Sequence, residues 1–176
     1  VLADVNGDTR PDLLVAAGNG VLLYLNDGIG DPFDAVPPFV AADAGTAVTA
    51  LAVGDLDGDG KPDLVVGTAG ATQVWRNGGT GTFTKTAHTL GTGAGSIAIG
   101  DVKGSAGADV LVRSGTVLAL WRNLGADDAT GAWLGFASDT LTGLPAAVET
   151  TAVLVTGDVD GDGDVDVLVT SASGDR

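Results

Sequence analysis

The chain has 176 residues and a formal net charge of −15, with 29 Gly, no Cys and no Met. Its length is ordinary for one domain, and a 44% share of hydrophobic residues is enough for a core, which excludes a disordered chain. The acidity disfavours nucleic acid or an anionic membrane surface as a partner, and the missing Cys excludes disulfides and zinc–thiolate sites.

A nine-residue segment rich in Asp and Gly recurs four times, over residues 4–12, 55–63, 101–109 and 158–166. Each copy begins and ends with Asp, carries Gly at its fourth position and is followed at once by an apolar run that predicts a β-strand. Of the 23 acidic residues, 14 lie in these four loops. The repeat therefore predicts both a metal-binding function and a repeating architecture.

The second unit displays the strand order most clearly. We expect strands over residues 48–54, 64–68, 71–77 and 83–90, with a Gly-rich turn at 78–81 before the last. No segment has a hydrophobic period of about 3.6 residues, so helices are not expected, and no apolar run reaches the roughly 18 residues that span a membrane. Four strands in a unit of about 50 residues predict an all-β fold of β-propeller blades, each with four antiparallel strands.

A fixed spacing joins each loop to an aromatic residue and an Asn. Counted from the first loop Asp, the aromatic residue is 20 positions on and the Asn 22 positions on, in three pairs: Tyr24 and Asn26, Trp75 and Asn77, Trp121 and Asn123. A constant offset indicates one rigid unit repeated along the chain. We interpret the aromatic residues as packing between blades rather than as a sugar-binding platform. Arg76 and Arg122, which follow two of them, are expected to pair with nearby acids.

The chain reads as a single propeller segment over residues 1–176, with blade units at about 1–47, 48–92, 93–146 and a truncated 147–176. In the fourth unit the aromatic residue and the Asn would fall beyond Arg176, so about three and a half blades are expected. Propellers close with about four to eight blades, so we expect a partial propeller whose open edges favour association. The start on Val1, without an initiator Met, predicts a fragment or a processed form.

Oxygen-bearing side chains stand at loop positions 1, 3, 5 and 9. Alternate residues of an extended segment point the same way, so three of these side chains can aim at one point. Calcium takes six to eight oxygen ligands at about 2.3–2.6 Å, which this set suits better than the smaller octahedron of magnesium. The helical EF-hand is disfavoured, because its twelfth position needs an acid, and Val15, Val66 and Val169 stand there.

The pattern Asp-x-Asp/Asn-x-Asp-Gly-x-x-Asp before Leu-Leu-Val or Leu-Val-Val resembles the FG-GAP/VCBS repeats of integrin α-subunit propellers and bacterial surface proteins. The resemblance covers essentially the whole chain and implies calcium held by side chains at positions 1, 3, 5 and 9 and a carbonyl at position 7. The implied ligands are Asp4, Asn6, Asp8, the Arg10 carbonyl and Asp12; Asp55, Asp57, Asp59, the Lys61 carbonyl and Asp63; and Asp158, Asp160, Asp162, the Asp164 carbonyl and Asp166.

The third loop departs from this pattern, because Lys103 and Ser105 occupy positions 3 and 5. A cation among the ligands repels calcium, so we expect this loop to be free of metal and about three sites in all. We also expect the Lys103 ammonium to pair with Asp101 and Asp109. For the other loops, the alternative is a set of Asp/Gly turns without metal, but their crowded carboxylates would then repel one another.

Other residues give weaker indications. Trp133 and Phe136 lie in the long variable segment 124–149, where they form either an exposed binding patch or a buried outer strand. His88 is the only His and has no nucleophile motif beside it, so a Ser–His–acid triad is not expected. The paired carboxylates follow loop spacing in every repeat, which favours metal ligands over the acid pair of a glycosidase. The chain is therefore predicted not to be an enzyme.

These observations favour a noncatalytic calcium-binding propeller module of a secreted or cell-surface protein, active in adhesion or protein–protein contact. Its partner would be a protein or a glycan, with no nucleic acid and no insertion into a membrane. One alternative is an accessory carbohydrate-binding domain of a secreted enzyme. A second is a structural element that self-assembles through its open blade edges.

Overall fold

The computed structural model describes residues 1–33, 38–105, 107–140, 142–144 and 147–170. All of the regular structure in these residues is β-strand, arranged in sheets whose strands follow one another in chain order and pair antiparallel. Part of the truncated last unit, residues 171–176, lies outside the described residues. No helix long and apolar enough to cross a membrane occurs in the described ranges.

Three sheets have four strands each, and the last has two. The first sheet holds β1 (Leu2–Ala3), β2 (Asp12–Ala17), β3 (Gly20–Tyr24) and β4 (Phe39–Asp43). The second holds β5 (Val48–Gly54), β6 (Asp63–Thr68), β7 (Thr72–Asn77) and β8 (Phe83–Thr89). The third holds β9 (Ala94–Gly100), β10 (Asp109–Ser114), β11 (Val117–Asn123) and β12 (Phe136–Asp139), and the fourth pairs β13 (Leu154–Gly157) with β14 (Asp166–Val169).

The strands expected in the second unit are confirmed, with boundary shifts of one residue. The strand before the loop covers residues 48–54, as predicted, and β6 begins one residue early, at the last loop Asp. β7 begins at Thr72 instead of residue 71, and β8 ends at Thr89 instead of residue 90. Apolar, β-branched runs bounded by loops and Gly-rich turns therefore locate these strands well, because a strand such as β6 buries both of its faces between neighbouring sheets.

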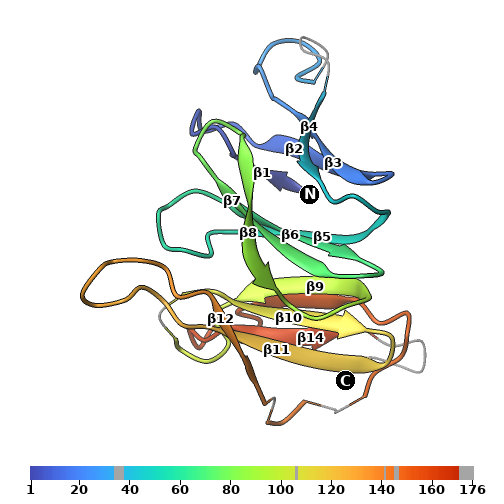
Figure 1. The fold of residues 1–176 in the computed structure, drawn as a ribbon, viewed down its shortest axis with the longest axis vertical. Coiled ribbons are helices and arrows are strands. Elements are labelled where there is room, and N and C mark those ends of the chain that lie inside the picture. Colours follow the sequence, from blue (N-terminus) through green and yellow to red (C-terminus); the bar gives the residue numbers. More distant parts are fainter. Residues whose placement is uncertain (34–37, 106, 141, 145–146, 171–176) are drawn as a thin grey trace.

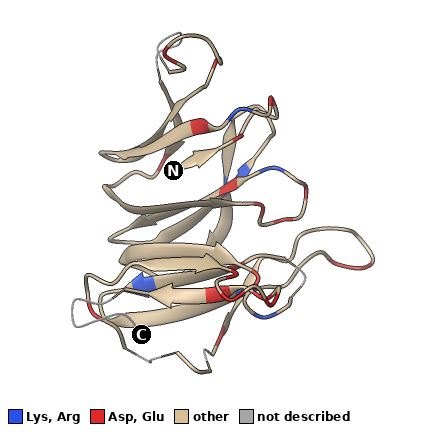
Figure 2. Ribbon diagram, turned by 180° about the vertical axis from the view of Figure 1, so that it is seen from behind, with Lys and Arg blue, Asp and Glu red and all other residues tan. Residues whose placement is uncertain are grey.

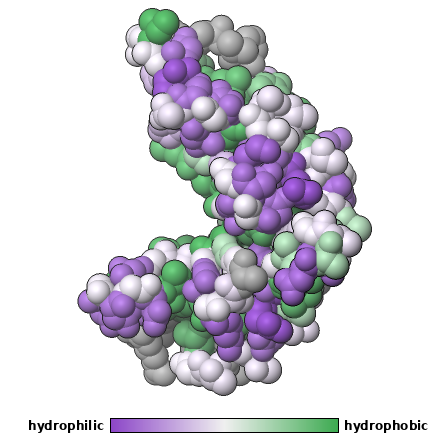
Figure 3. All heavy atoms as spheres, turned by 90° about the vertical axis from the view of Figure 1, so that its left-hand side faces the viewer, coloured by the Kyte–Doolittle hydropathy of each residue, from purple (hydrophilic) through white to green (hydrophobic). Residues whose placement is uncertain are grey.

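The first, second and third sheets follow one another along the long axis of the molecule, and the fourth overlaps the third in this view, where β13 contacts β9 (Figure 1). In side view the stack curves into a crescent around an open hollow (Figure 3). No sheet closes on itself among the described residues, so the fold is a partial β-propeller of four-stranded antiparallel blades.

The core lies between successive blades. On β6, Leu64 and Val66 join the cluster shared with the first blade, whereas Val65 joins the cluster shared with the third. Every residue of β6 is buried, because a strand in the middle of a stack has a neighbour on each face. Complete burial of one such Val or Leu side chain stabilises the fold by about 1.5–3 kcal/mol.

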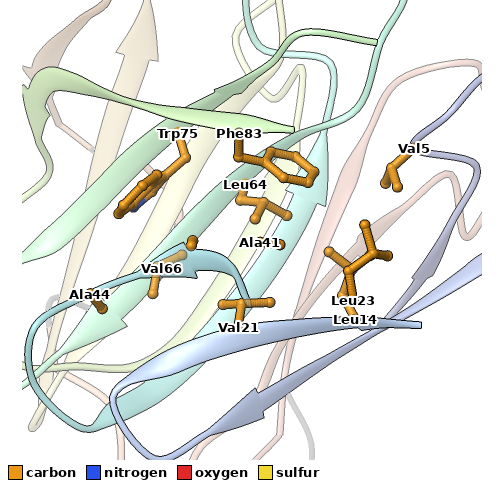
Figure 4. Close-up of a cluster of buried hydrophobic side chains, with 11 residues drawn as sticks. Val5, Leu14, Val21, Leu23, Ala41, Ala44, Leu64, Val66, Trp75 and Phe83 are labelled. Carbon is orange, nitrogen blue, oxygen red and sulfur yellow. The ribbon is translucent and has the colours of Figure 1, made fainter. Parts of the chain in front are cut away.

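Figure 4 shows the first interface between blades, where apolar side chains of the first and second sheets meet. Its labelled residues are Val5, Leu14, Val21, Leu23, Ala41 and Ala44 from the first blade and Leu64, Val66, Trp75 and Phe83 from the second. The innermost strands lie so close that a Cβ on Gly54 would come within 2.8 Å of Ile99 in the next blade. A side chain at residue 54 would therefore push neighbouring blades apart.

The aromatic residues divide between two packing roles. Trp75 is 8% exposed in the interface between the first two blades, and Trp121 packs against the next interface, which confirms the interpretation of these two as blade-packing residues. Trp133 is half-buried, contacts His88 and Phe136 edge-on, and donates from Nε1 to Asn123 Oδ1 at 3.0 Å. For the segment 124–149 the sequence predicts either an exposed binding patch or a buried outer strand. The contacts of Trp133 favour the packed arrangement.

Candidate metal centres

Three of the four loops have the same internal hydrogen bonds. In loops 1, 2 and 4 the first Asp accepts the backbone N–H of position 4 through Oδ1 and that of position 6 through Oδ2. These bonds are Gly7 and Thr9 to Asp4 at 2.8 and 2.7 Å, Gly58 and Gly60 to Asp55 at 2.9 and 2.9 Å, and Gly161 and Gly163 to Asp158 at 2.7 and 3.1 Å. The loop thus curls around its first carboxylate.

The side chains at positions 3 and 5 are held in the same way. Position 5 donates its N–H to the side chain at position 3, as Asp59 does to Asp57 at 3.2 Å and Asp162 does to Asp160 at 3.1 Å. Position 7 donates to position 5, as Lys61 does to Asp59 at 3.0 Å. Asp57, Asp59 and Asp160 thus each accept a backbone N–H through Oδ1, and Oδ2 remains available for another partner.

The last Asp of each loop ties the loop to the sheet. Asp12, Asp63 and Asp109 are fully buried. Asp63 Oδ2 accepts the N–H of Leu56 at position 2, at 3.0 Å, and its Oδ1 accepts the N–H of Asn77 at 2.8 Å. The same bond reaches Asp12 from Asn26 at 2.9 Å and Asp109 from Asn123 at 2.8 Å. This backbone bond holds the position 22 residues after the first loop Asp against the loop, whereas the Asn side chain at that position donates to the carbonyl before the last loop Asp.

Two loops bring three carboxylates together. Oxygens of Asp55, Asp57 and Asp63 lie within 4.8 Å of one another, and so do oxygens of Asp158, Asp160 and Asp166. The side chain of Asp57 is only 2% exposed; its Oδ2 forms an ion pair with Arg76 but receives no hydrogen bond. Carboxylate oxygens at this spacing fit the oxygen-only coordination that calcium requires, although Asp57 Oδ2 would have to exchange its Arg76 partner for the ion.

The carboxylate at position 5 does not join these clusters. Asp59 Oδ2 instead lies 3.1 Å from Lys61 Nζ and 4.0 Å from an Arg76 nitrogen. Burial opposes its ionisation, but the hydrogen bonds and charge of Lys61, with the charge of Arg76, hold the pKa of Asp59 below its usual value. In the first loop Asp8 Oδ2 is likewise engaged, by Arg10 at 2.6 Å and by the amide of Asn6 at 3.0 Å. The ion pair predicted for Arg76 is confirmed, as is that of Arg122 with Asp139 at 3.2 Å.

Asp63 has the most perturbed acidity of these ligands. Burial, with the nearby charges of Asp57 and Asp59, raises the pKa of its carboxyl to about 6, against the lowering effect of the N–H bonds from Asn77 and Leu56. The pKa of Asp4 lies below its usual value, because four backbone N–H groups outweigh its partial desolvation. A divalent cation would replace the repulsion among the carboxylates of the second loop with attraction.

The third loop has a different network. Ser105 donates its N–H to Asp101 at 2.7 Å and its hydroxyl to Asp109 Oδ1 at 2.9 Å, while Lys103 donates its backbone N–H to Asp109 Oδ2 at 3.1 Å. Among the described residues, the Lys103 ammonium is exposed and pairs with neither acid, so the predicted ion pair is wrong. The short Ser105 side chain reaches the buried carboxylate directly, and the long Lys side chain stays in water.

The repeated Asn joins neighbouring blades, a role that the sequence did not reveal. Asn77 Nδ2 donates to the Val5 carbonyl in the preceding loop at 2.9 Å, and Asn123 Nδ2 donates to the Leu56 carbonyl at 2.7 Å. Each also donates to the carbonyl before the last Asp of its own loop, at 3.1 and 3.0 Å. The fixed spacing was the one sequence signal for this role, and it marks a residue that locks each loop to the next blade.

The stacked four-stranded sheets, each with an Asp-rich loop between its first two strands, define a repeat protein of the partial-propeller class. The family model for the FG-GAP-like repeat matches residues 4–66 and 55–112, which together span more than half of the chain. The chain therefore belongs to the FG-GAP repeat family. A comparison with curated proteins returns no match.

Two solved structures have similar folds. A lectin of Agrocybe aegerita, described as recognising non-reducing terminal N-acetylglucosamine, is 18% identical with a TM-score of 0.62 over 99% of this chain and 47% of its own. The Tc holotoxin pore of Photorhabdus luminescens is 21% identical with a TM-score of 0.56 over 99% of this chain and 8% of its own. The chain thus spans less than half the length of each protein, and at these identities the likeness establishes the fold alone.

Proposed function

We propose that this chain is a noncatalytic calcium-binding module of a secreted or cell-surface protein, and that it acts through contacts with a protein or glycan. The observation that carries the proposal is the hydrogen-bond network shared by loops 1, 2 and 4 and missing from loop 3, together with the three carboxylates that converge in loops 2 and 4. FG-GAP repeats are typical of extracellular proteins, which supports the location.

The residues that would hold the ion are the side chains at positions 1, 3 and 9, which converge in loops 2 and 4. The side chain at position 5 would join them by exchanging its basic partner for the ion, and the carbonyl at position 7 would be a further ligand. Bound calcium would supply positive charge to the crowded carboxylates, and the chain supplies their positions through the backbone bonds within each loop. Because the last loop Asp also accepts the N–H of the repeated Asn, a filled loop would hold the first three strands of its blade together.

The test is a count of metal per folded chain together with a melting curve. We expect three calcium ions per chain, one for each intact loop. Chelation should lower the melting temperature, because each site contributes about 2.7 kcal/mol at a calcium concentration of about one hundred times its dissociation constant. The variant Asp160→Lys, which copies the cation at position 3 of the third loop, should lose one ion, whereas the control Lys103→Gln should keep the count unchanged. Protein without calcium whose melting temperature ignores EDTA would contradict the proposal.

A carbohydrate-binding accessory role is a second candidate, favoured by the structural likeness to the Agrocybe aegerita lectin. Glycan-array screening of the chain would separate it from a module that binds proteins. Trp133→Ala is a poor discriminator, because the Trp133 indole is already engaged with Asn123 and His88.

Self-association is a third candidate, favoured by apolar residues on the two outer faces of the stack. Val155 and Leu168 on the fourth sheet are 49% and 43% exposed, whereas Leu111, which occupies the same position on β10 as Leu168 on β14, is fully buried. On the first sheet Leu2 and Val40 are 60% and 59% exposed. Light scattering with and without calcium would test this candidate, and a monomer at every concentration would exclude it.

A further inference from the structure

A polar pocket of about 350 Å³ lies on the second blade, beside the second Asp-rich loop. Its walls include Lys61, Arg76, Lys85, Thr84, Thr86 and Asp59, and no large apolar side chain lines it. Ligand pockets are usually lined by apolar groups with a few polar ones, so a lining of cations and hydroxyls selects a ligand that is itself polar and charged.

The pocket gathers positive charge in a chain that has little of it. The chain has 8 Lys and Arg against 23 Asp and Glu, and three of those eight cations line this one pocket. Figure 2 shows how sparse the Lys and Arg positions are on the fold. Lys85 Nζ also lies 5.9 Å from the Trp75 ring centroid, so cation–π attraction helps to fix its position. The three cations share the pocket with Asp59, and Arg76 also contacts the Asp57 carboxylate, so the pocket attracts anions once these two carboxylates are engaged elsewhere.

The other blades do not repeat this arrangement. Arg122 occupies the position in the third blade that Arg76 has in the second, one residue before the repeated Asn. It pairs with Asp139 of the outer strand β12 at 3.2 Å, whereas the acids that pair with Arg76 belong to the Asp-rich loop. On the second blade the outer strand places Thr84 opposite Arg76 and contributes no acid to the pocket. In the first blade, Leu25 occupies the position equivalent to Arg76. Among the three blades whose outer strand lies in the described residues, only the second therefore has this basic pocket.

Two of the pocket cations are held by carboxylates of the second loop. Arg76 forms an ion pair with Asp57, and Lys61 Nζ lies 3.1 Å from Asp59. Asp57 and Asp59 are among the proposed calcium ligands, so calcium in this loop would compete with Arg76 and Lys61 for the same oxygens. Their side chains are about half exposed, at 48% and 44%, which leaves both free to turn toward an anion in the pocket.

We infer that this pocket binds the acidic group of an anionic sugar, a carboxylate or a sulfate, and that calcium in the adjacent loop raises its affinity. The planar Arg76 guanidinium matches a carboxylate or sulfate edge, and the Thr84 hydroxyl beside it suits a sugar hydroxyl. The inference that the pocket binds an acidic sugar depends on the residues that line it. The inference that calcium raises the affinity rests on the proposed function.

The test is calorimetric titration of the whole chain with three trisaccharides of one length: a uronic acid, a sulfated sugar and a neutral one. We expect the acidic sugars to bind and the neutral one to bind at least about tenfold more weakly. The uronic and sulfated arms distinguish the two sources of the anion. Arg76→Gln should weaken acidic-sugar binding about tenfold, and the matched control Arg122→Gln should leave it unchanged. Lys85→Gln, on an exposed edge strand, serves as a second variant in case Arg76→Gln disturbs the loop.

Equal binding of the neutral sugar, equal binding of a Glu-rich peptide, or unchanged affinity in both Arg76→Gln and Lys85→Gln would overturn the inference. Repeating the wild-type titration in EDTA tests whether calcium raises the affinity for the sugar. Titrating Arg76→Gln in the presence of calcium measures how strongly the ion itself binds the sugar when the arginine is absent. We expect the wild-type affinity to fall about tenfold in EDTA, as reciprocal coupling requires. Three bound ions with no effect on sugar affinity would refute the coupling alone, whereas a chain that binds no calcium would refute the proposed function.

Discussion

The bond between blades made by the repeated Asn can be measured by comparing Asn77→Ala with Asn26→Ala. Both residues follow an intact loop, both donate their backbone N–H to the last loop Asp, and both donate from Nδ2 to the loop carbonyl before that Asp. Both also accept an N–H through Oδ1, from Gly79 at 2.8 Å and from Gly28 at 2.9 Å. Among the described residues, the one side-chain hydrogen bond that Asn77 makes and Asn26 lacks is the bond to the Val5 carbonyl, at 2.9 Å.

The expected loss of stability in each variant depends on how deeply its hydrogen bonds are buried. Asn77 is 4% exposed and its bond to the Val5 carbonyl is fully buried, so Asn77→Ala removes a buried hydrogen bond worth about 1–1.5 kcal/mol, although the Val5 carbonyl still accepts the Gly81 N–H at 3.1 Å. The two bonds that Asn26 and Asn77 share lie nearer to solvent and contribute about 0.5 kcal/mol each. We therefore expect Asn77→Ala to lower the free energy of unfolding by about 2 kcal/mol and Asn26→Ala to lower it by about 1 kcal/mol.

The assay is urea unfolding at saturating calcium, followed by Trp fluorescence and circular dichroism. Coincident transitions by the two probes would justify a two-state free energy. Equal losses in the two variants would refute the reasoning, because the bond across the blade boundary would then contribute nothing. A wild-type-like Asn77→Ala variant would refute it as well.

Three further perturbations test other parts of the account. Thr9 has a left-handed φ of 70° where loops 2 and 4 have Gly, so Thr9→Gly should stabilise the chain by about 1 kcal/mol in thermal unfolding; a loss would contradict this. Calcium binding in the second loop should weaken about tenfold from pH 7 to pH 5, because the pKa of Asp63 is raised to about 6 and its proton must leave before it can bind a metal. The same raised pKa means that stability without calcium falls as pH rises from about 4 through 6, and titration calorimetry and melting curves over that range measure both effects. Leu111→Ala should cost about 2–5 kcal/mol in urea unfolding, and Leu168→Ala at the equivalent, 43% exposed position should cost under about 1 kcal/mol; equal costs would refute the packing between blades.

Local spacing in the sequence was enough to predict the blades and their loops. The strands of the second unit follow from apolar, β-branched runs bounded by Asp- and Gly-rich turns, and the candidate metal loops follow from Asp at alternate positions with Gly between. These features depend on residues a few positions apart, so the chain alone determines them. The difference of the third loop also follows from the sequence, since Lys103 and Ser105 replace acids there.

Contacts between distant residues were decided by the tertiary structure alone. The partner of Asn77 is the Val5 carbonyl, 72 residues away, and the acidity of Asp63 depends on burial under neighbouring strands. The Ser105 hydroxyl, rather than the Lys103 ammonium, reaches Asp109, because the buried carboxylate admits a short side chain and a long cation remains solvated. Which side chains meet across a blade boundary depends on how the sheets stack, and that arrangement arises from the packing of whole blades rather than from any local pattern.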